Sequence, residues 1–178
     1  MAERKRDAEF VEYVSSRSAW LRKTAYLLCG DWHRADDLVQ TSITKLYVNW
    51  GRAGGVENID GYARTVLVNT FLAEQRAPWV RRVLLRTSDS DSDSDSEEAA
   101  RLPDLEASLD LREALAALPP RQRATVVLRY FCDLSVEQTA DALDCSTGNV
   151  KSQTSRGIDA LRRLLGARPA PATEGLPT

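Results

Sequence analysis

A run of serine and acidic residues near the middle of the chain most constrains what it can fold into. Residues 88–98 contain only Ser, Asp and Glu, so this stretch has no apolar side chain to bury. Its carboxylates repel one another, and its Ser and Asp side chains compete for backbone hydrogen bonds. The run predicts a flexible linker that divides the chain into two blocks joined by a tether.

Composition limits what the two blocks can be. Hydrophobic residues make up 43% of the 178 residues and charged residues 28%, which is ordinary for a globular protein folding in water. Six acidic residues lie in the central run, so the rest of the chain is mildly basic despite the net charge of -2. No apolar run approaches the roughly 20 residues of a membrane span, and the N-terminus lacks an apolar signal segment. We expect a cytoplasmic protein without membrane insertion.

Cysteine usage gives no indication of a metal or cofactor. Cys29, Cys132 and Cys145 are widely spaced and form no CxxC pair. His33 follows Cys29 by four residues, but two ligands without a second pair make a poor zinc site. We expect reduced cysteines that pack, with no metal and no cofactor.

Three stretches of the N-terminal block carry apolar residues at helical spacing. The first stripe ends at Gly30 and Asp31, which predict a helix stop followed by a helix start. The second stripe ends at Gly51 and the glycine pair Gly54 and Gly55, and the third begins near Asp60 and is closed by Pro78. The stripes are Phe10, Val14, Leu21, Ala25 and Leu28; Val39, Ile43, Leu46, Tyr47 and Trp50; and Tyr62, Val66, Thr70 and Ala73 with Ala63, Leu67 and Phe71 beside them. No alternating strand pattern competes, so three helices sharing one core are predicted.

The C-terminal block has the spacing of a helix-turn-helix. Leu118-Pro119-Pro120 breaks the chain before a helix predicted over residues 121–131. Ser135 and Gln138 form a capping-box pattern that opens a short helix, and residues 144–146 form a brief turn before a helix over 147–165. Small Ala140 would allow the two helices to cross closely. The fold class is therefore all-α, with two small helical domains, a disordered acidic linker and a C-terminal helix-turn-helix.

The second helix of this motif carries a basic face that suits DNA. Its exposed candidates for phosphate and base-edge contacts are Asn149, Lys151, Ser152, Ser155 and Arg156. Such a helix enters the major groove in helix-turn-helix proteins. A helical hairpin with a solvated charged face is the alternative that spacing alone leaves open.

These residues resemble the extracytoplasmic-function (ECF, group IV) sigma factors of bacterial RNA polymerase, of the sigma-70 superfamily, over nearly the whole chain and particularly their actinobacterial members. The stretch from Leu118-Pro-Pro-Arg-Gln-Arg through Val150-Lys-Ser resembles the family's fourth region, and Asp36-Asp-Leu-Val-Gln40 resembles its second-region signature. The resemblance implies domain bounds of 1–80 for region 2, 81–105 for the linker, 106–168 for region 4 and 169–178 for a disordered tail.

The resemblance also assigns partners to particular residues. It implies that Asp36, Asp37, Gln40 and Thr41 bind core RNA polymerase at the clamp helices of its largest subunit, with the polymerase flap a further contact. It implies that Asn58, Arg64, Asn69 and Arg76 serve recognition and melting of the minus 10 element, where a flipped base needs a polar group to contact its edge. The residues named above on the last helix fall where the family contacts the minus 35 element. Asp144 stands where a Gly is frequent in the family, and Asn149 where a Thr is usual.

The resemblance implies a sigma factor that binds core polymerase, directs promoter-specific initiation and is controlled by an anti-sigma factor. The acidic linker is then either a spacer or a polyanion mimic that threads into polymerase channels. A stand-alone helix-turn-helix regulator is the alternative. An enzyme is not expected, because the single histidine, the lack of a Gly-rich phosphate loop and the lack of metal-ligand spacing offer no catalytic constellation.

Overall fold

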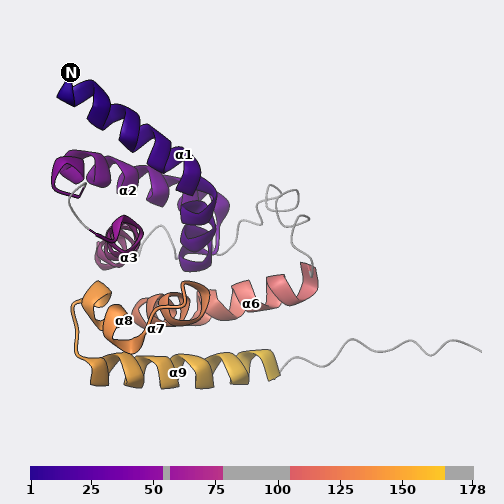
Figure 1. The fold of residues 1–178 in the computed structure, drawn as a ribbon. Helices are drawn as coiled ribbons and strands as arrows, with labels where there is room; N and C mark the ends of the chain where they lie inside the picture. Colours follow the sequence, from indigo (N-terminus) through magenta and orange to yellow (C-terminus); the bar gives the residue numbers. More distant parts are fainter. Residues whose placement is uncertain (54–56, 78–104, 167–178) are drawn as a thin grey trace, which may run out of the picture.

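The computed structural model of the chain describes residues 1–53, 57–77 and 105–166, with the side chains of 105–108 left aside. Every regular element in these ranges is a helix (Figure 1), which confirms the all-α class. The N-terminal group is α1 (Ala2–Cys29), α2 (Trp32–Ala53) and α3 (Ile59–Arg76). The C-terminal group is α6 (Leu105–Ala117), α7 (Pro120–Val126), the π-helix η2 (Val127–Phe131), α8 (Val136–Leu143) and α9 (Thr147–Gly166). The predicted tail and, apart from Leu105, the predicted linker lie outside the described residues.

The break between α1 and α2 is made by the two residues that the sequence indicates. Gly30 adopts a left-handed conformation with φ 74°, which glycine takes without steric cost, and its N–H donates to the Tyr26 carbonyl at 2.7 Å. Asp31 then accepts a hydrogen bond from the Arg34 N–H through Oδ1 at 2.8 Å, which caps α2. The predicted stop and start are confirmed.

Helix α2 continues through Gly51 and ends at Ala53, immediately before the glycine pair that the sequence indicates. A glycine inside a helix costs only about 1 kcal/mol relative to alanine, and packing at the same turn compensates for it. The preceding residue, Trp50, is buried and meets the rings of Phe10 and Tyr13 on α1 at centroid distances of 5.1 and 5.3 Å. Gly54 and Gly55 lie outside the described residues.

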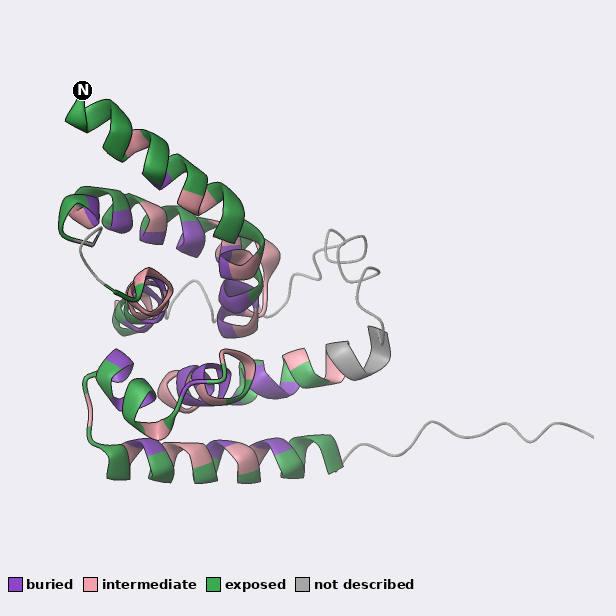
Figure 2. Ribbon diagram, viewed as in Figure 1, coloured by how far each residue is buried: buried purple, intermediate pink, exposed green. Residues whose placement is uncertain are grey.

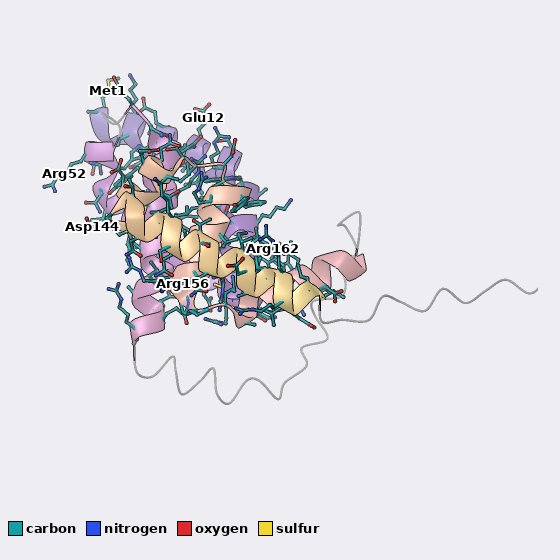
Figure 3. The ribbon with its side chains drawn as sticks, turned by 90° about the horizontal axis from the view of Figure 1, so that it is seen from below. Met1, Glu12, Arg52, Asp144, Arg156 and Arg162 are labelled. Carbon is teal, nitrogen blue, oxygen red and sulfur yellow. The ribbon has the colours of Figure 1, made fainter. Side chains whose placement is uncertain are left out.

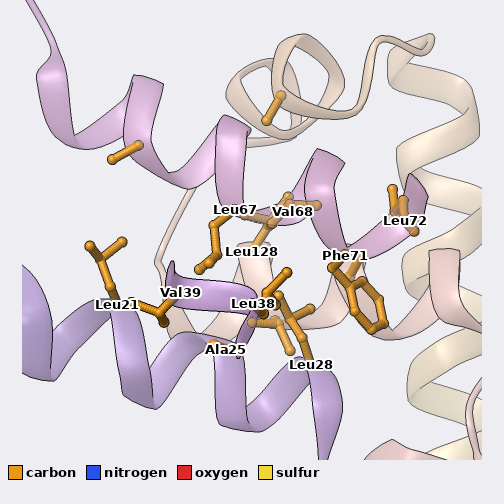
Figure 4. Close-up of a cluster of buried hydrophobic side chains, with 14 of the residues drawn as sticks. Leu21, Ala25, Leu28, Leu38, Val39, Leu67, Val68, Phe71, Leu72 and Leu128 are labelled. Atoms are coloured by element: carbon orange, nitrogen blue, oxygen red, sulfur yellow. The ribbon is translucent and has the colours of Figure 1, made fainter. Parts of the chain in front are cut away.

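The apolar stripes of the N-terminal group meet in one core, and α2 departs from its predicted stripe at one position. Tyr47 is 41% exposed and donates its hydroxyl to Asp7 Oδ1 at 3.0 Å, whereas Leu38 is fully buried. Figure 4 shows Leu38 and Val39 between the side chains of α1 and those of α3. The buried set from these helices includes Leu21, Ala25, Leu28, Leu46, Leu67, Val68 and Phe71.

The helix predicted over residues 121–131 is present but not regular. It runs as an α-helix to Val126 and then as a π-helix to Phe131, closed by the bond from the Cys132 N–H to the Val127 carbonyl at 3.0 Å. A π turn accommodates one more residue than an α turn. The predicted capping box of α8 is confirmed, since Ser135 accepts from the Gln138 N–H at 3.0 Å while Gln138 accepts from the Ser135 N–H at 2.9 Å.

The two helical groups pack against each other instead of standing apart (Figures 1 and 2). Helix α3 lies against α8 and α7, and α1 lies against α6, α7 and η2. Leu128 of η2 belongs to the same buried cluster as Leu28 and Phe71 of the N-terminal group, as Figure 4 shows. A separate small cluster joins α6, α7 and α9. The tether predicted from the sequence therefore connects two groups that share part of one core.

None of the helices in the described part of the chain is long and apolar enough to cross a membrane.

Candidate nucleic-acid and polymerase interfaces

Helix α9 separates an apolar side from a polar side along its whole length. Val150, Gly157 and Leu161 recur at i, i+7 and i+11 and are buried against the rest of the C-terminal group. The predicted contacts to the minus 35 element lie on the opposite side and are exposed; we call Lys151, Ser152, Ser155 and Arg156 the upstream face. Figure 3 shows α9 lying across the surface of the molecule with Arg156 and Arg162 labelled along it. Asn149 is only half exposed, so it lies at the edge of this face.

The turn before α9 fixes where the helix begins. Asp144 is left-handed, with φ 50° and ψ 57°, at the position where the resemblance noted that glycine is frequent. Ser146 then accepts a hydrogen bond from the Asn149 N–H at 3.1 Å through its hydroxyl, which caps the first turn of α9. These two residues place the start of the upstream face beside the end of α8.

Gly157 is a determinant of this geometry that the sequence analysis missed. A Cβ on Gly157 would lie 2.7 Å from Val126 Cγ2, closer than real carbon atoms approach. Helix α9 therefore lies on α7 at a distance that only glycine permits. The available signal was a glycine in the middle of a basic amphipathic helix, because a glycine there that made no close contact would only cost stability.

A groove beside the upstream face brings in further residues that the sequence analysis did not select. It has a volume of about 340 Å³ and includes Arg129, Tyr130, Lys151, Ser155 and Arg162 in its lining, with Asp159 as its acidic residue. Tyr130 is 62% exposed, which is unusual for an aromatic ring unless it meets a partner. Three cations around one carboxylate make the groove attractive to phosphate.

The residues predicted to serve the minus 10 element lie at different places on helix α3. Asn69 and Arg76 are exposed and seven residues apart, which places them on one face. Asn58 caps α3 by accepting from the Gly61 N–H at 2.8 Å, so its side-chain oxygen is already used at the start of this helix. Arg64 lies on another face, with its guanidinium 4.9 Å from the centre of the Trp20 ring on α1.

Asn69 touches the C-terminal group directly. Its side-chain Nδ2 donates to the Ala142 carbonyl of α8 at 3.4 Å. The polar group that the sequence predicts for reading a flipped base therefore faces the helix-turn-helix in this arrangement. This contact is not predicted from the sequence, because the acidic run indicates two independent groups joined by a tether.

An exposed stripe on α2 carries three of the predicted polymerase contacts. Asp37, Gln40 and Thr41 are exposed at spacings of three and four residues, so they share one face; we call them the polymerase stripe. Thr44 and Val48 continue this face, and Val48 is 77% exposed. Val48 is therefore an exposed apolar side chain at the end of an otherwise polar face.

Asp36 differs from Asp37 in what surrounds it. Its carboxylate accepts two hydrogen bonds from Arg22 of α1, at 2.6 Å from Nε and 3.2 Å from Nη2. The Arg22 guanidinium also lies 4.5 Å from the centre of the Trp32 ring, which stacks on Tyr26 at 3.9 Å. Asp36 therefore helps fix α1 against α2, whereas Asp37 of the same acidic pair points to solvent.

Arg123 is a buried cation that the sequence analysis passed over within the Leu118-Pro-Pro-Arg-Gln-Arg stretch. Its Nη1 donates to the Leu28 carbonyl at 2.6 Å, and its Nη2 donates to the carbonyls of Ala116 and Leu118 at 2.8 and 3.0 Å. Burial lowers the pKa of this guanidinium to about 10, so it remains protonated at neutral pH. The charge faces carbonyl dipoles at the ends of α1 and α6.

The short helix α8, the turn after it and the longer helix α9 with its exposed upstream face define a helix-turn-helix DNA-binding protein. Residues 108–161 match the model of sigma-70 region 4, and residues 13–79 match that of sigma-70 region 2.

Similar proteins place the chain in one family. It is 36% identical over 161 residues to the RNA polymerase sigma-E factor of Streptomyces coelicolor, covering 90% of this chain and 88% of the relative. It is 30% identical over 145 residues to the ECF RNA polymerase sigma factor EcfG of Rhodopseudomonas palustris, covering 82% of this chain and 78% of the relative. The sigma factor RpoE of Bartonella quintana, solved in complex with the anti-sigma factor NepR, has a similar structure with a TM-score of 0.71 and 25% identity over 90% of this chain and 99% of that one. The chain belongs to the ECF family of RNA polymerase sigma factors.

Proposed function

We propose that this sigma factor directs core RNA polymerase to promoters that carry a minus 35 and a minus 10 element, using separate faces of the described helices. The upstream face of α9 contacts the minus 35 element, α3 contacts the minus 10 element, and the polymerase stripe of α2 docks on the clamp helices of the largest subunit. The observation that carries the proposal is the division of α9, whose apolar side packs inside the protein while its polar side is presented to solvent.

The upstream face has the chemistry for both parts of DNA recognition. Lys151 and Arg156 supply cations for phosphates or guanine edges, and Ser152 and Ser155 are short donors and acceptors. Each good base contact discriminates by about 1 to 3 kcal/mol, and the phosphate contacts add affinity that falls as salt rises. Tyr130 and Arg129 beside this face extend the same surface.

On α3 the structure favours a smaller minus 10 set than the four predicted residues. Asn69 and Arg76 share an exposed face, so we propose that they contact the flipped base and its neighbouring phosphates directly. Asn58 orients the start of the helix through its cap, and Arg64 acts from the side against Trp20. Both then support the site by positioning α3.

The chain supplies recognition, while core polymerase makes the RNA. We therefore propose no catalytic step for this chain, and a cytoplasmic location where polymerase and DNA are found. We keep the bounds of 1–80, 81–105, 106–168 and 169–178 as the proposed region 2, linker, region 4 and tail.

We also propose control by an anti-sigma factor. The structurally similar Bartonella quintana protein was solved with such a partner. The polymerase stripe and the upstream face are both exposed here, so a protein that covered either one would block initiation.

Two matched variants test the division of labour. Arg156→Ala should weaken selection of the minus 35 element by about tenfold while leaving affinity for core polymerase unchanged, because one base contact is lost. Gln40→Ala with Asp37→Lys should have the opposite effect, weakening polymerase binding and leaving DNA selectivity intact in the complexes that form. Equal loss of both properties in either variant would contradict the assignment. A stand-alone regulator would bind its DNA specifically without any affinity for core polymerase.

A further inference from the structure

A pocket of about 690 Å³ lies beside the shared core, where α1 and the start of α2 meet α6, α7, η2 and α9. Its volume is within the range of about 300 to 1,000 Å³ that is typical of small-molecule sites. Exposed residues such as Ala19 and Lys23 belong to its lining, so the pocket is open to solvent. Its other walls are mainly apolar and include Leu27, Trp32, Leu115, Phe131, Ile158 and Leu161.

One wall of the pocket is held in place by an aromatic stack. Trp32 lies on Tyr26 with the ring centres 3.9 Å apart and the planes 10° from parallel. The Tyr26 hydroxyl accepts a hydrogen bond from Arg112 Nη1 at 3.4 Å, which ties the stack to α6. A ligand that meets a wall already fixed in this way does not have to order it on binding.

The charges around the pocket have one sign. Its lining includes the cations Arg22, Lys23 and Arg112, and none of the lining residues that the structure describes is acidic. Asp36 bonds to Arg22 from outside the lining, so the positive charge of the pocket rests mainly on the other two cations. Lys23 Nζ lies 5.6 Å from the centre of the Phe131 ring, which places an ammonium group directly beside an apolar wall.

We propose that this pocket binds a small amphipathic acid, a molecule with an apolar body and one carboxylate. The body lies against the apolar walls, and the carboxylate lies beside Lys23 at the solvent edge. This inference goes beyond the proposed function, because promoter recognition requires no small molecule. Tyr130 and Ile158 line both this pocket and the groove beside the upstream face, so the bound acid lies next to the surface proposed to contact DNA.

The arrangement favours an acid over other occupants of the same shape. Removing the apolar body from water is favourable for any of them. A carboxylate at the solvent edge keeps part of its hydration and still faces the Lys23 ammonium, so it is not left as a buried unpaired charge. A neutral molecule lacks the attraction to the cations, and a molecule with a positive head group is repelled by them.

Two probes with apolar chains of equal length and opposite charge test the assignment. Decanoate has the proposed chemistry, and decyltrimethylammonium is its cationic counterpart. Isothermal titration calorimetry of the full-length chain, at concentrations at which neither probe forms micelles, gives the two affinities. Decanoate should bind at least fivefold more tightly than the cationic probe.

The isoleucine methyl groups locate the bound probe. The chain has three isoleucines, so a spectrum of the full-length chain with labelled isoleucine δ1 methyl groups contains three signals. Ile158 lines the pocket, whereas Ile43 and Ile59 pack against the core cluster of the N-terminal group. Decanoate should shift the Ile158 signal in a saturable manner and leave the other two in place.

Four substitutions at exposed positions of α1 provide variants and matched controls. Ala19→Trp places a large side chain in the lining of the pocket, and Ala8→Trp makes the same change on the same helix outside the lining. Lys23→Glu reverses the charge beside Phe131, and Lys5→Glu reverses a charge that is paired only with Glu9 on the surface. Circular dichroism and thermal unfolding first establish that each variant keeps the helix content and stability of the wild type.

Lys23→Glu should weaken decanoate binding about fivefold and strengthen binding of the cationic probe by a similar factor, because an attraction at the solvent edge becomes a repulsion. Ala19→Trp should weaken both probes about tenfold, because the indole occupies their space. Ala8→Trp and Lys5→Glu should match the wild type.

Three results would overturn the proposal. The first is no saturable shift of Ile158, or an equal shift of all three isoleucine signals. The second is a wild-type chain that binds both probes equally or prefers the cation. The third is a loss of decanoate affinity in the controls as large as that in the pocket variants. Failure of the proposed function is distinguishable from all three, because these measurements contain neither polymerase nor DNA.

Discussion

The close contact between Gly157 of α9 and Val126 of α7 predicts opposite effects of Gly157→Ala in two backgrounds. The substitution should destabilise the wild-type chain and stabilise a Val126→Ala variant. A Cβ at position 157 would lie 2.7 Å from Val126 Cγ2. Val126 is buried and β-branched, so its methyl group has no free rotamer into which to move. Gly157→Ala should therefore push α9 away from α7.

The magnitude follows from two opposing effects. Overpacking a buried contact costs about 1 to 3 kcal/mol, whereas replacing glycine by alanine inside a helix gains about 1 kcal/mol. Gly157→Ala should lower the free energy of unfolding by up to about 2 kcal/mol in the wild-type chain. In a Val126→Ala background the clashing methyl is gone, so the same substitution should raise it by about 1 kcal/mol.

The assay is urea unfolding of the wild type, the two single variants and the double variant, followed by circular dichroism. The double-mutant cycle should give a coupling energy of about 1 to 3 kcal/mol between the two positions. Promoter selectivity should fall in Gly157→Ala and recover in the double variant, since the upstream face returns to its place. Additive effects would refute the reasoning, because they would show that α9 does not depend on this contact.

Three further predictions concern single residues. Asp144→Gly should raise the free energy of unfolding by about 1 kcal/mol in urea titrations, because glycine adopts the left-handed conformation at φ 50° without a Cβ penalty; a loss of stability would mean that the Asp144 side chain stabilises the turn. Lys151→Ala should weaken binding to all DNA sequences alike and reduce the salt slope of log affinity by about 1, as measured by fluorescence anisotropy; a change confined to one base position would assign it to base contact instead. Burial raises the pKa of Cys29 to about 12, so at pH 8 the thiol stays protonated in the folded chain. It should be alkylated only after unfolding, which mass spectrometry of the peptides would detect. Rapid alkylation of the folded chain would contradict its burial.

Local signals in the sequence were sufficient for most helix boundaries. The Gly30 stop, the Asp31 start, the proline break before α7 and the capping box at Ser135 each depend on residues close in sequence, and each is confirmed. Helix α2 continues through Gly51 to Ala53 because a tertiary contact, Trp50 against Phe10, outweighs the cost of that glycine. The π turn after Val126 likewise carries no local composition signal.

For the candidate sites, too, the sequence predicted local features and could not predict long-range contacts. The sequence correctly predicted Lys151, Ser152, Ser155 and Arg156 on the exposed side of α9. The family resemblance pointed to Asp37, Gln40 and Thr41, which share one exposed face of α2. Their roles in binding stay predictions. What the sequence could not provide was the relation between the two groups, since Arg123 reaches the carbonyl of a residue 95 positions away. Long-range contacts of this kind leave no periodic pattern.

The most direct test of the central claim is initiation by core RNA polymerase in the presence of the purified chain and a library of promoter sequences. The account predicts transcripts from a restricted set of templates that share two conserved elements, and loss of these transcripts when either element is scrambled. Core polymerase that produces no specific transcripts under any condition, or that selects templates by the upstream element alone, would contradict it.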